Sequence, residues 1–201
     1  MEARTRAFII QKMPYEENSI LVKALLQDRG KCHFFLSKKN SLPDLCEVEL
    51  SYRVSPNAKV KPYEWHVLDP LLFLRDDWDK LSCALEWSKA LLSLPEDFCD
   101  LSYDQTSSIY EVFRIFLKEL EKTGPYNSLR VLFYLKILQL EGLLSWAPSS
   151  SNPLFDQFTL SETLLLQECF NQKKFSALHS LEIPSEWVPK MGDLFSNFMK
   201  R

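Results

Sequence analysis

Short apolar runs separated by turn-forming residues characterise the first 75 residues of the chain. Five runs rich in β-branched and aromatic residues lie at residues 7–10, 20–22, 32–36, 48–52 and 63–68. Pro14, Gly30 and Pro43 are among the turn formers between them. The pattern predicts five β-strands. Because an open sheet of so few strands leaves exposed edges, we predict a small closed barrel, for which the five-stranded OB-fold is the commonest solution.

The hydrophobic period becomes helical after residue 70. Apolar residues recur at spacings of three and four over residues 78–92, 109–120 and 129–140, and further helices are predicted near 160–170, 175–181 and 187–198. Gly30 and Gly142 stand where a strand turn and a helix end favour a positive φ. We therefore predict an α+β protein, with an N-terminal five-stranded OB-fold β-barrel (residues 1–75) followed by an all-α helical domain (residues 76–201).

Charge is distributed unevenly along the 201 residues, whose net charge is −3. Residues 1–75 contain 12 Lys and Arg against 9 Asp and Glu, whereas residues 76–201 contain 12 against 18. The modest positive excess in the first region permits phosphate binding there. No apolar run approaches the roughly 18 residues of a membrane span, and the N-terminus lacks a signal-peptide pattern. We therefore expect a cytoplasmic protein without a membrane partner.

The sequence lacks the usual patterns of catalytic and metal sites. Cysteines stand at positions 32, 46, 83, 99 and 169 without C-x-x-C spacing, and they are interpreted as reduced, mostly buried thiols. The three histidines have no Cys or carboxylate at ligand or triad spacing, and no phosphate loop, G-x-S-x-G or H-E-x-x-H motif occurs. We predict no catalytic residue, no metal and no cofactor, and hence a protein that is not an enzyme.

Basic and aromatic residues of the barrel region are candidates for binding single strands, which requires cations along a groove and exposed rings for stacking. The candidate DNA-binding cations are Arg4, Arg6, Lys12, Lys23, Arg29, Lys31, Lys38 and Lys39, and Arg53, Lys59 and Lys61 are further basic candidates of the same region. The candidate stacking rings are Tyr15, Phe35, Tyr52 and Tyr63. The alternative is that the charges cover solvated strand faces and that the rings fill the barrel core.

The order of residues in these runs resembles the N-terminus of the bacterial recombination mediator RecO family. The resemblance is carried by residues 6–12 (RAFIIQK), 14–20 (PYEENSI), 25–31 (LLQDRGK) and 36–39 (LSKK), followed by the helical segments 129–138 and 141–143. The family's Lys-Gly step is Lys38-Lys39-Asn40 here, so Asn40 is expected to make the turn in a left-handed conformation. The family's cysteine-rich zinc knuckle is missing after residue 143, so the chain resembles a short form without zinc.

The resemblance implies a non-catalytic role in DNA repair and recombination. RecO-type proteins bind single- and double-stranded DNA, anneal complementary strands and, with RecR in the RecFOR pathway, help to load RecA onto SSB-coated DNA in the nucleoid. Their helical domain also binds the acidic, apolar C-terminal tail of SSB. Cations on apolar helices are the candidates for that tail, namely Arg114, Lys118, Arg130 and Lys136.

Two other functions stay open at this point. The chain could be a protein-interaction adaptor with an OB barrel, in which case the cationic stems cover the core and nucleic acid does not bind. It could also be an RNA-binding OB protein. The dependence of nucleic-acid binding on salt separates the adaptor from the other two, and competition between DNA and RNA separates those.

Overall fold

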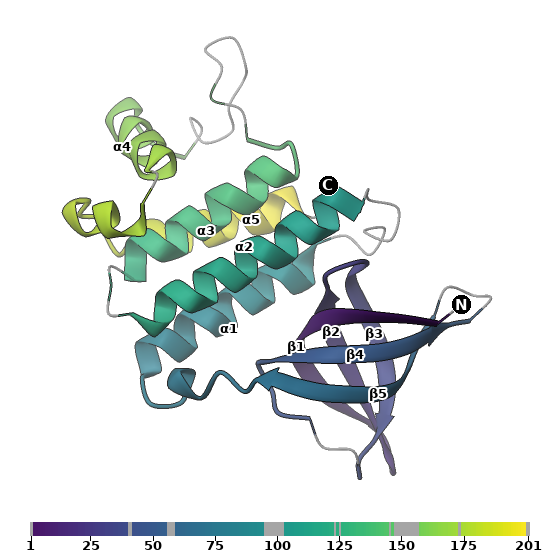
Figure 1. Cartoon of the computed structure of the whole chain (residues 1–201). Coiled ribbons are helices and arrows are strands. Elements are labelled where there is room, and N and C mark those ends of the chain that lie inside the picture. Colours follow the sequence, from purple (N-terminus) through teal and green to yellow (C-terminus); the bar gives the residue numbers. More distant parts are fainter. Residues whose placement is uncertain are drawn as a thin grey trace. The chain divides into compact units, whose positions relative to one another are not determined.

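The computed structural model describes residues 2–39, 42–55, 59–94, 103–122, 124, 126–144, 146, 157–172 and 174–199 (Figure 1). The strands are β1 (Glu2–Glu16), β2 (Ser19–Leu26), β3 (Gly30–Ser37), β4 (Cys46–Val54) and β5 (Val60–Asp69). The α-helices are α1 (Trp78–Ser93), α2 (Tyr103–Glu121), α3 (Tyr126–Leu140), α4 (Leu160–Asn171) and α5 (Trp187–Phe198). Short 3-10 helices cover Leu72–Leu74 and Phe175–Ser180. The predicted α+β class is confirmed.

The chain divides into two compact units. The sheet unit comprises residues 1–76 together with residues 94–111. The helical unit comprises residues 77–93 together with residues 112–201. The first part of α2 therefore groups with the strands, and the rest of α2 groups with the other helices.

The five strands form one antiparallel sheet in the order β3-β2-β1-β4-β5. The edge strands β3 and β5 lie close to each other. Within the described residues, however, no hydrogen-bonded ladder joins these two strands, so the sheet is open. The closed barrel predicted from the sequence is therefore not confirmed, and the curved sheet stands in its place.

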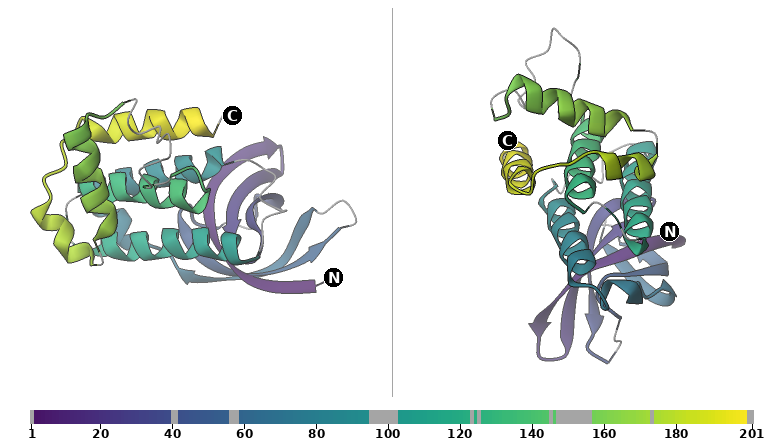
Figure 2. Two further views of the ribbon diagram at one scale, coloured as in Figure 1. Left: turned by 90° about the horizontal axis from the view of Figure 1, so that it is seen from above. Right: turned by 90° about the vertical axis from the view of Figure 1, so that its left-hand side faces the viewer.

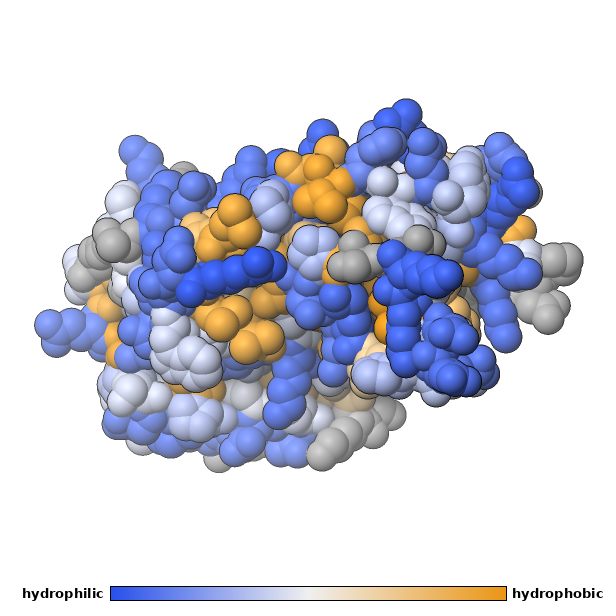
Figure 3. All heavy atoms as spheres, turned by 90° about the horizontal axis from the view of Figure 1, so that it is seen from below, coloured by the Kyte–Doolittle hydropathy of each residue, from blue (hydrophilic) through white to orange (hydrophobic). Residues whose placement is uncertain are grey.

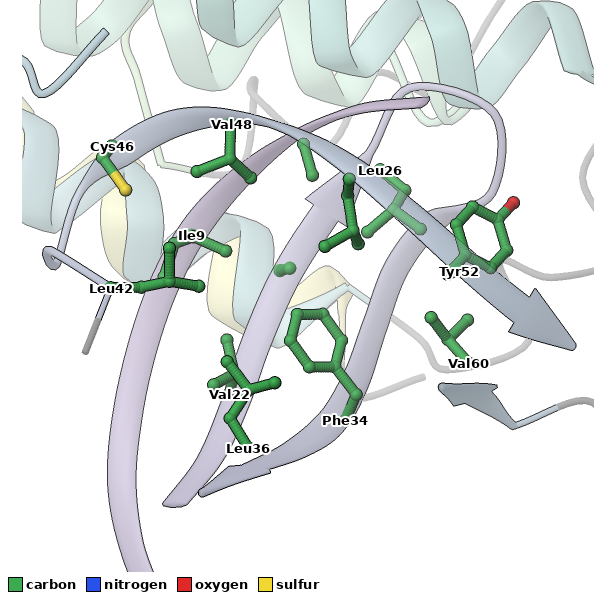
Figure 4. Packing of buried hydrophobic residues seen from close by; sticks show 13 residues of the cluster. Ile9, Val22, Leu26, Phe34, Leu36, Leu42, Cys46, Val48, Tyr52 and Val60 are labelled. Atoms are coloured by element: carbon green, nitrogen blue, oxygen red, sulfur yellow. The ribbon is translucent and has the colours of Figure 1, made fainter. Parts of the chain in front are cut away.

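The concave side of the sheet encloses an apolar core (Figure 4). Directly opposite residues of an antiparallel pair share a face, so the pairs Ile9–Ala24 and Val22–Phe34 both face inward. Strand β4 adds alternate positions to the same interior, as its period of two requires. The buried residues of this core are Ala7, Ile9, Val22, Ala24, Leu26, Phe34, Leu36, Leu42, Cys46, Val48, Leu50, Tyr52 and Val60.

A bulge in β1 sets which of its side chains face outward, and a glycine at the start of β3 makes the turn after β2. Ile9 pairs with Ala24 but Gln11 pairs with Lys23, so Ile10 is an extra residue and the alternation reverses beyond it. At the start of β3, Gly30 has a φ of 71°, which confirms the prediction of a positive φ and explains why glycine stands there. Odd-numbered residues of β1 therefore face the core only as far as Ile9, and beyond the bulge the even-numbered Lys12 takes the inner face.

The start of α2 covers part of the convex side within the sheet unit. The Tyr110 Oη donates a 2.5 Å hydrogen bond to Oε1 of Glu47, and its ring lies 5.0 Å from that of Phe8. Phe8 and Leu25 pair across β1 and β2 on this face and are almost fully buried. This part of the convex side therefore belongs to the protein interior and offers no binding surface.

In the helical unit, α1, α3 and α5 pack side by side and α4 runs across their direction (Figure 2). Trp87 lies at the centre, with its ring stacked 5.0 Å from Phe133 and edge-on 5.4 Å from Phe116. Positions all around α3 are buried, as its nearly continuous apolar sequence predicts. No helix in the described ranges combines the length and the apolarity that crossing a membrane requires.

Candidate functional site

Three of the predicted DNA-binding cations are engaged in holding the sheet unit together. Beyond the bulge, Lys12 pairs with Val22 and so shares the inner face, where its ammonium donates to the main-chain carbonyl of Leu42 and lies 3.6 Å from Asp44. Lys31 donates to the main-chain carbonyl of Leu94. Both ammonium groups thus bind main-chain carbonyls of the protein itself.

Arg29 belongs to a hydrogen-bonded chain at the turn between β2 and β3. Its Nε donates to the Tyr52 hydroxyl at 3.0 Å, and that hydroxyl donates to Oδ2 of Asp28 at 2.5 Å. Burial and the Asp28 carboxylate raise the pKa of Tyr52 to about 12, so the hydroxyl stays protonated. Tyr52 is fully buried. The expectation that its ring is a stacking platform is therefore wrong, because that ring fills the core.

The cations on the convex side of β1 and β4 stand among carboxylates. The Arg4 guanidinium donates to Glu49, which raises the pKa of Arg4 and lowers that of Glu49. Arg6 is exposed and directly opposite Glu49 in the ladder. Arg53 donates to Glu2 at 2.9 Å. This region thus has alternating signs of charge, and its net attraction for a phosphate is small.

The convex side of β2 and β3, together with the end of β3, carries the remaining predicted cations. Lys23 is half-buried and directly opposite His33. Lys38 and Lys39 follow β3 and are exposed, and the Lys38 main-chain N–H donates to the Asn18 carbonyl at 3.0 Å. The Lys38 Nζ also donates to the Glu17 carbonyl at 2.5 Å. Among the described residues, no ion pair joins any of these three lysines to a carboxylate.

Two exposed aromatic rings stand on the same side of the sheet. Tyr15 is 58% exposed and Phe35 is 49% exposed, and their ring centroids are 4.6 Å apart. Tyr63, the fourth candidate ring, lies on β5 with the Arg53 guanidinium 5.2 Å above it. The structure therefore brings together Tyr15 and Phe35 with Lys23, Lys38 and Lys39, and we call these five residues the basic–aromatic face.

Exposure of apolar side chains alone does not mark a site in this protein. Figure 3 shows one side of the molecule, on which apolar side chains form separate patches among hydrophilic ones. Single exposed apolar residues of this kind are common on soluble proteins. What distinguishes Tyr15 and Phe35 is that the two rings contact each other in a sheet region whose lysines have no carboxylate partner among the described residues.

The four cations predicted to bind the SSB tail have different surroundings in the helical unit and do not form one site. Arg130 faces α1, where its Nε lies 3.3 Å from the Glu86 carboxylate and its Nη2 donates to the Ser82 hydroxyl at 2.9 Å. Lys118 is exposed on α2, and Arg114 on the same helix is half-buried with an interaction of its own. Lys136 lines a pocket of the helical unit.

That pocket has a volume of about 270 Å³ and is mostly apolar. Lys136 and Lys174 contribute its two cations. The Lys136 ammonium lies 3.7 Å from the centroid of the Phe170 ring, and burial lowers the pKa of this lysine. The other lining residues are Val112, Ile115, Phe116, Leu132, Gln172, Phe175 and Leu178. Sequence reasoning missed Lys174, because its place in the pocket depends on how the 3-10 helix that follows it packs.

The described residues include no cluster of possible metal ligands, and three of their cysteines have a raised pKa. Within the described ranges, no three His, Cys, Asp or Glu side chains gather in a way that could hold a metal ion. Burial raises the pKa of Cys46 and of Cys169 to about 12 and that of Cys83 to about 11, which keeps these thiols protonated and unreactive. Cys99 and Asn40, and with it the expected left-handed turn, lie outside the described residues.

No protein-family model matches this chain, and the search of curated proteins finds no match to it either. The resemblance to the RecO family therefore rests on the residues that carry it in the sequence.

Proposed function

We propose that the protein is a RecO-like mediator of DNA repair and recombination. It binds single- and double-stranded DNA through the basic–aromatic face, anneals complementary strands and, with RecR, helps to load RecA onto SSB-coated DNA. The observation that carries the proposal is the position of Lys38 and Lys39, which are exposed beside the Tyr15–Phe35 pair and have no carboxylate partner among the described residues.

We also propose that the sheet is an OB-fold barrel. An OB-fold is a five-stranded, partly open Greek-key barrel that binds oligonucleotides on its β2–β3 face and on the neighbouring loops. The strand order β3-β2-β1-β4-β5 supports this proposal, as does the proximity of β3 to β5, the pair that would close the barrel. In such a barrel the basic–aromatic face occupies the ligand-binding position.

The chemistry of this face suits a nucleic-acid backbone. Exposed ammonium groups bind phosphates as point charges and release counterions when they do so. Contacts of this type position a strand without reading its bases, so the same face can hold strands of any sequence. Annealing then follows because two complementary backbones are held near one positive surface, where their mutual repulsion is reduced.

The pocket of the helical unit supports the second part of the proposal, which is binding of the SSB tail. An acidic tail with apolar side chains needs an apolar cavity with cations at its edge. The pocket provides Phe116, Leu132 and Phe175 as apolar walls, with Lys136 and Lys174 as cations. Lys136 has already lost part of its hydration, so a carboxylate that reaches it interacts in a medium of reduced dielectric constant.

A peptide-binding measurement tests this second part. The probe is a peptide whose C-terminal residues combine carboxylates with apolar side chains, and the readout is its affinity for the wild type and for Lys136→Ala/Lys174→Ala. We expect the double variant to lose at least about tenfold in affinity, because two charge-assisted contacts are removed. Lys89→Ala, which changes an exposed lysine of α1 away from the pocket, is the control. Equal binding by all three proteins contradicts the assignment.

DNA binding of the wild type tests the first part. Labelled single-stranded and duplex DNA are titrated at two salt concentrations, and strand annealing is followed under the same conditions. A phosphate binder loses affinity steeply as salt rises, and we expect this for both forms of DNA. The absence of any salt-sensitive binding supports the adaptor instead, and preferential displacement of DNA by RNA of the same sequence supports the RNA-binding alternative.

A further inference from the structure

We propose that Tyr15 and Phe35 form a stacking site for an unpaired base, which makes the protein distinguish single-stranded from duplex DNA. The inference rests on the proposed DNA-binding function and assigns a separate task to each part of the basic–aromatic face. The lysines hold the backbone of either form, whereas the two rings add affinity only where a base presents an open π-face.

The two rings meet because three strands bring them to one place. Phe35 is directly opposite Leu21 on the convex side of β3 and β2. Tyr15 lies at a register shift of β1, between Pro14, which pairs with Ile20, and Glu16, which pairs with Ser19. The shift releases Tyr15 from the ladder, and its ring contacts Phe35 at a centroid distance of 4.6 Å with the planes tilted by 50°.

The two rings are exposed while contacting each other. The apolar core of the sheet unit lies on the opposite, concave side, where Phe34 is almost fully buried. Tyr15 and Phe35 instead leave about half of their surfaces in water, although burying them elsewhere would be favourable. An exposed pair of rings in contact therefore offers a ready surface on which a third ring can stack.

Cations lie on both sides of this pair along the sheet. Lys23 on β2 is opposite His33, which precedes Phe35 by two residues on β3. Lys38 follows Phe35 by three residues, a displacement of about 10 Å at the usual rise of a strand. The charge complementarity selects a polyanion as the occupant. A strand that places its phosphates at these lysines brings the bases between them to the rings, which is the arrangement that single-strand binders use.

Duplex DNA cannot use the two rings in the same way. Its bases are stacked on one another, so only their edges are accessible in the grooves. A single strand exposes its bases, and each stacked base typically contributes enough affinity to change binding by about five- to 150-fold when the ring is replaced by alanine. Tyr63 lacks this property because the Arg53 guanidinium already lies over its ring.

The test compares an oligodeoxythymidylate, an abasic strand of the same length and a duplex. The proteins are the wild type, Tyr15→Ala/Phe35→Ala, the ring-conserving Tyr15→Phe/Phe35→Tyr, and Trp78→Ala as a control at an exposed ring of α1. We expect the wild type to bind the thymidylate strand more tightly than the abasic strand. The alanine variant should lose about five- to 150-fold for the thymidylate strand alone, with its affinity for abasic strand and duplex kept. The ring-conserving variant and Trp78→Ala should bind as the wild type does.

Different results would overturn the stacking site alone and the proposed DNA-binding function. Equal, salt-sensitive binding of thymidylate and abasic strands by the wild type overturns the stacking site and leaves DNA binding intact, and this result does not depend on whether any variant folds. An alanine variant that folds and keeps its affinity for the thymidylate strand also overturns it, as expected if the rings serve a protein partner. A wild type without salt-sensitive binding to any of the three ligands overturns both.

Discussion

Two regions of the sheet unit carry basic side chains and use them differently. On the inner face and at its loops, Lys12 donates to a main-chain carbonyl and Arg29 donates to the buried Tyr52 hydroxyl. On the basic–aromatic face, Lys38 and Lys39 are exposed, with no carboxylate partner among the described residues. The cations of the first region are partly buried and hold the fold together. Those of the second are exposed to solvent, where a phosphate can reach them, although Lys38 also donates to the Glu17 carbonyl.

The difference shows that the net charge of a region does not measure its capacity to bind phosphate. Residues 1–75 have an excess of three positive charges over negative ones. Arg4 and Arg53 are nevertheless paired with Glu49 and Glu2 on the convex side of β1 and β4. What matters for a polyanion is the number of exposed cations without a partner. At the end of β3 two such lysines, Lys38 and Lys39, follow each other directly in the chain.

The largest effect is expected at Arg130, an engaged cation of the helical unit. Arg130→Ala leaves the half-buried Glu86 carboxylate without its guanidinium partner and should lower the free energy of unfolding by about 3 kcal/mol at pH 7. Chemical denaturation measures this loss. Per folded molecule, binding of the acidic peptide should be unchanged because Arg130 does not line the pocket. A variant of wild-type stability that fails to bind the peptide contradicts this assignment.

The stability lost in Arg130→Ala should also change with pH in a defined direction. Burial raises the pKa of Glu86 above its usual 4.5, so the folded protein retains the proton more strongly and the stability contribution of this group falls as pH rises above 4.5. Without Arg130 the carboxylate loses an attraction that lowers its pKa, and the shift increases. The stability difference between wild type and Arg130→Ala should therefore widen from about pH 4.5 to pH 7. A constant difference over this range argues against the role of Glu86.

The same substitution at one lysine of each region tests the difference between the two regions directly. Lys12→Met keeps the apolar stem but removes the donor to the Leu42 carbonyl, and it should cost about 1 to 2 kcal/mol of stability. Lys38→Met is the same substitution at an exposed residue, and it should change stability by less than about 0.5 kcal/mol. DNA affinity should show the opposite order, with a loss only for Lys38→Met. If both substitutions change stability and DNA affinity equally, the proposed difference between a structural and a DNA-binding lysine is wrong.

The smallest expected effect is a gain of affinity. Glu16 and Glu17 are exposed beside the turn whose carbonyl binds Lys38, and their charges repel a phosphate at that lysine. Glu16→Gln/Glu17→Gln should tighten DNA binding by about twofold. The gain is small because solvent and salt screen the repulsion between exposed charges. The gain should disappear at high salt. A loss of affinity in this variant indicates that the strand follows another route over the sheet.

The period of the sequence was sufficient to predict the elements. The five apolar runs became β1 to β5, and the predicted helix over residues 78–92 corresponds to α1 at Trp78–Ser93. Interior positions repeat every two residues in strands and about every 3.6 in helices, so the pattern follows from local geometry. Gly30 and Gly142 both have the positive φ that was predicted, at 71° and 69°.

The assignment of individual cations could not be predicted in the same way. The extra residue Ile10 turns Lys12 to the inner face, and no period in the sequence reveals a single-residue bulge. Lys31 and Arg130 find their partners 63 and 47 residues away in sequence, respectively, at Leu94 and Cys83. Lys174 reaches the pocket through the packing of a 3-10 helix beside α2 and α3. Such contacts depend on tertiary structure.

The salt dependence of single-stranded DNA binding by Lys38→Ala/Lys39→Ala is the most direct test of the account. Circular dichroism first confirms the fold, and Lys89→Ala/Lys122→Ala removes the same charge from exposed positions of the helical unit as a control. Each lost phosphate contact lowers the salt slope by roughly 0.7, which corresponds to about fivefold in affinity at 0.1 M salt, or about 25-fold for two contacts. We expect both losses in the Lys38/Lys39 variant and neither in the control. A folded Lys38/Lys39 variant with the affinity and the salt slope of the wild type contradicts the account.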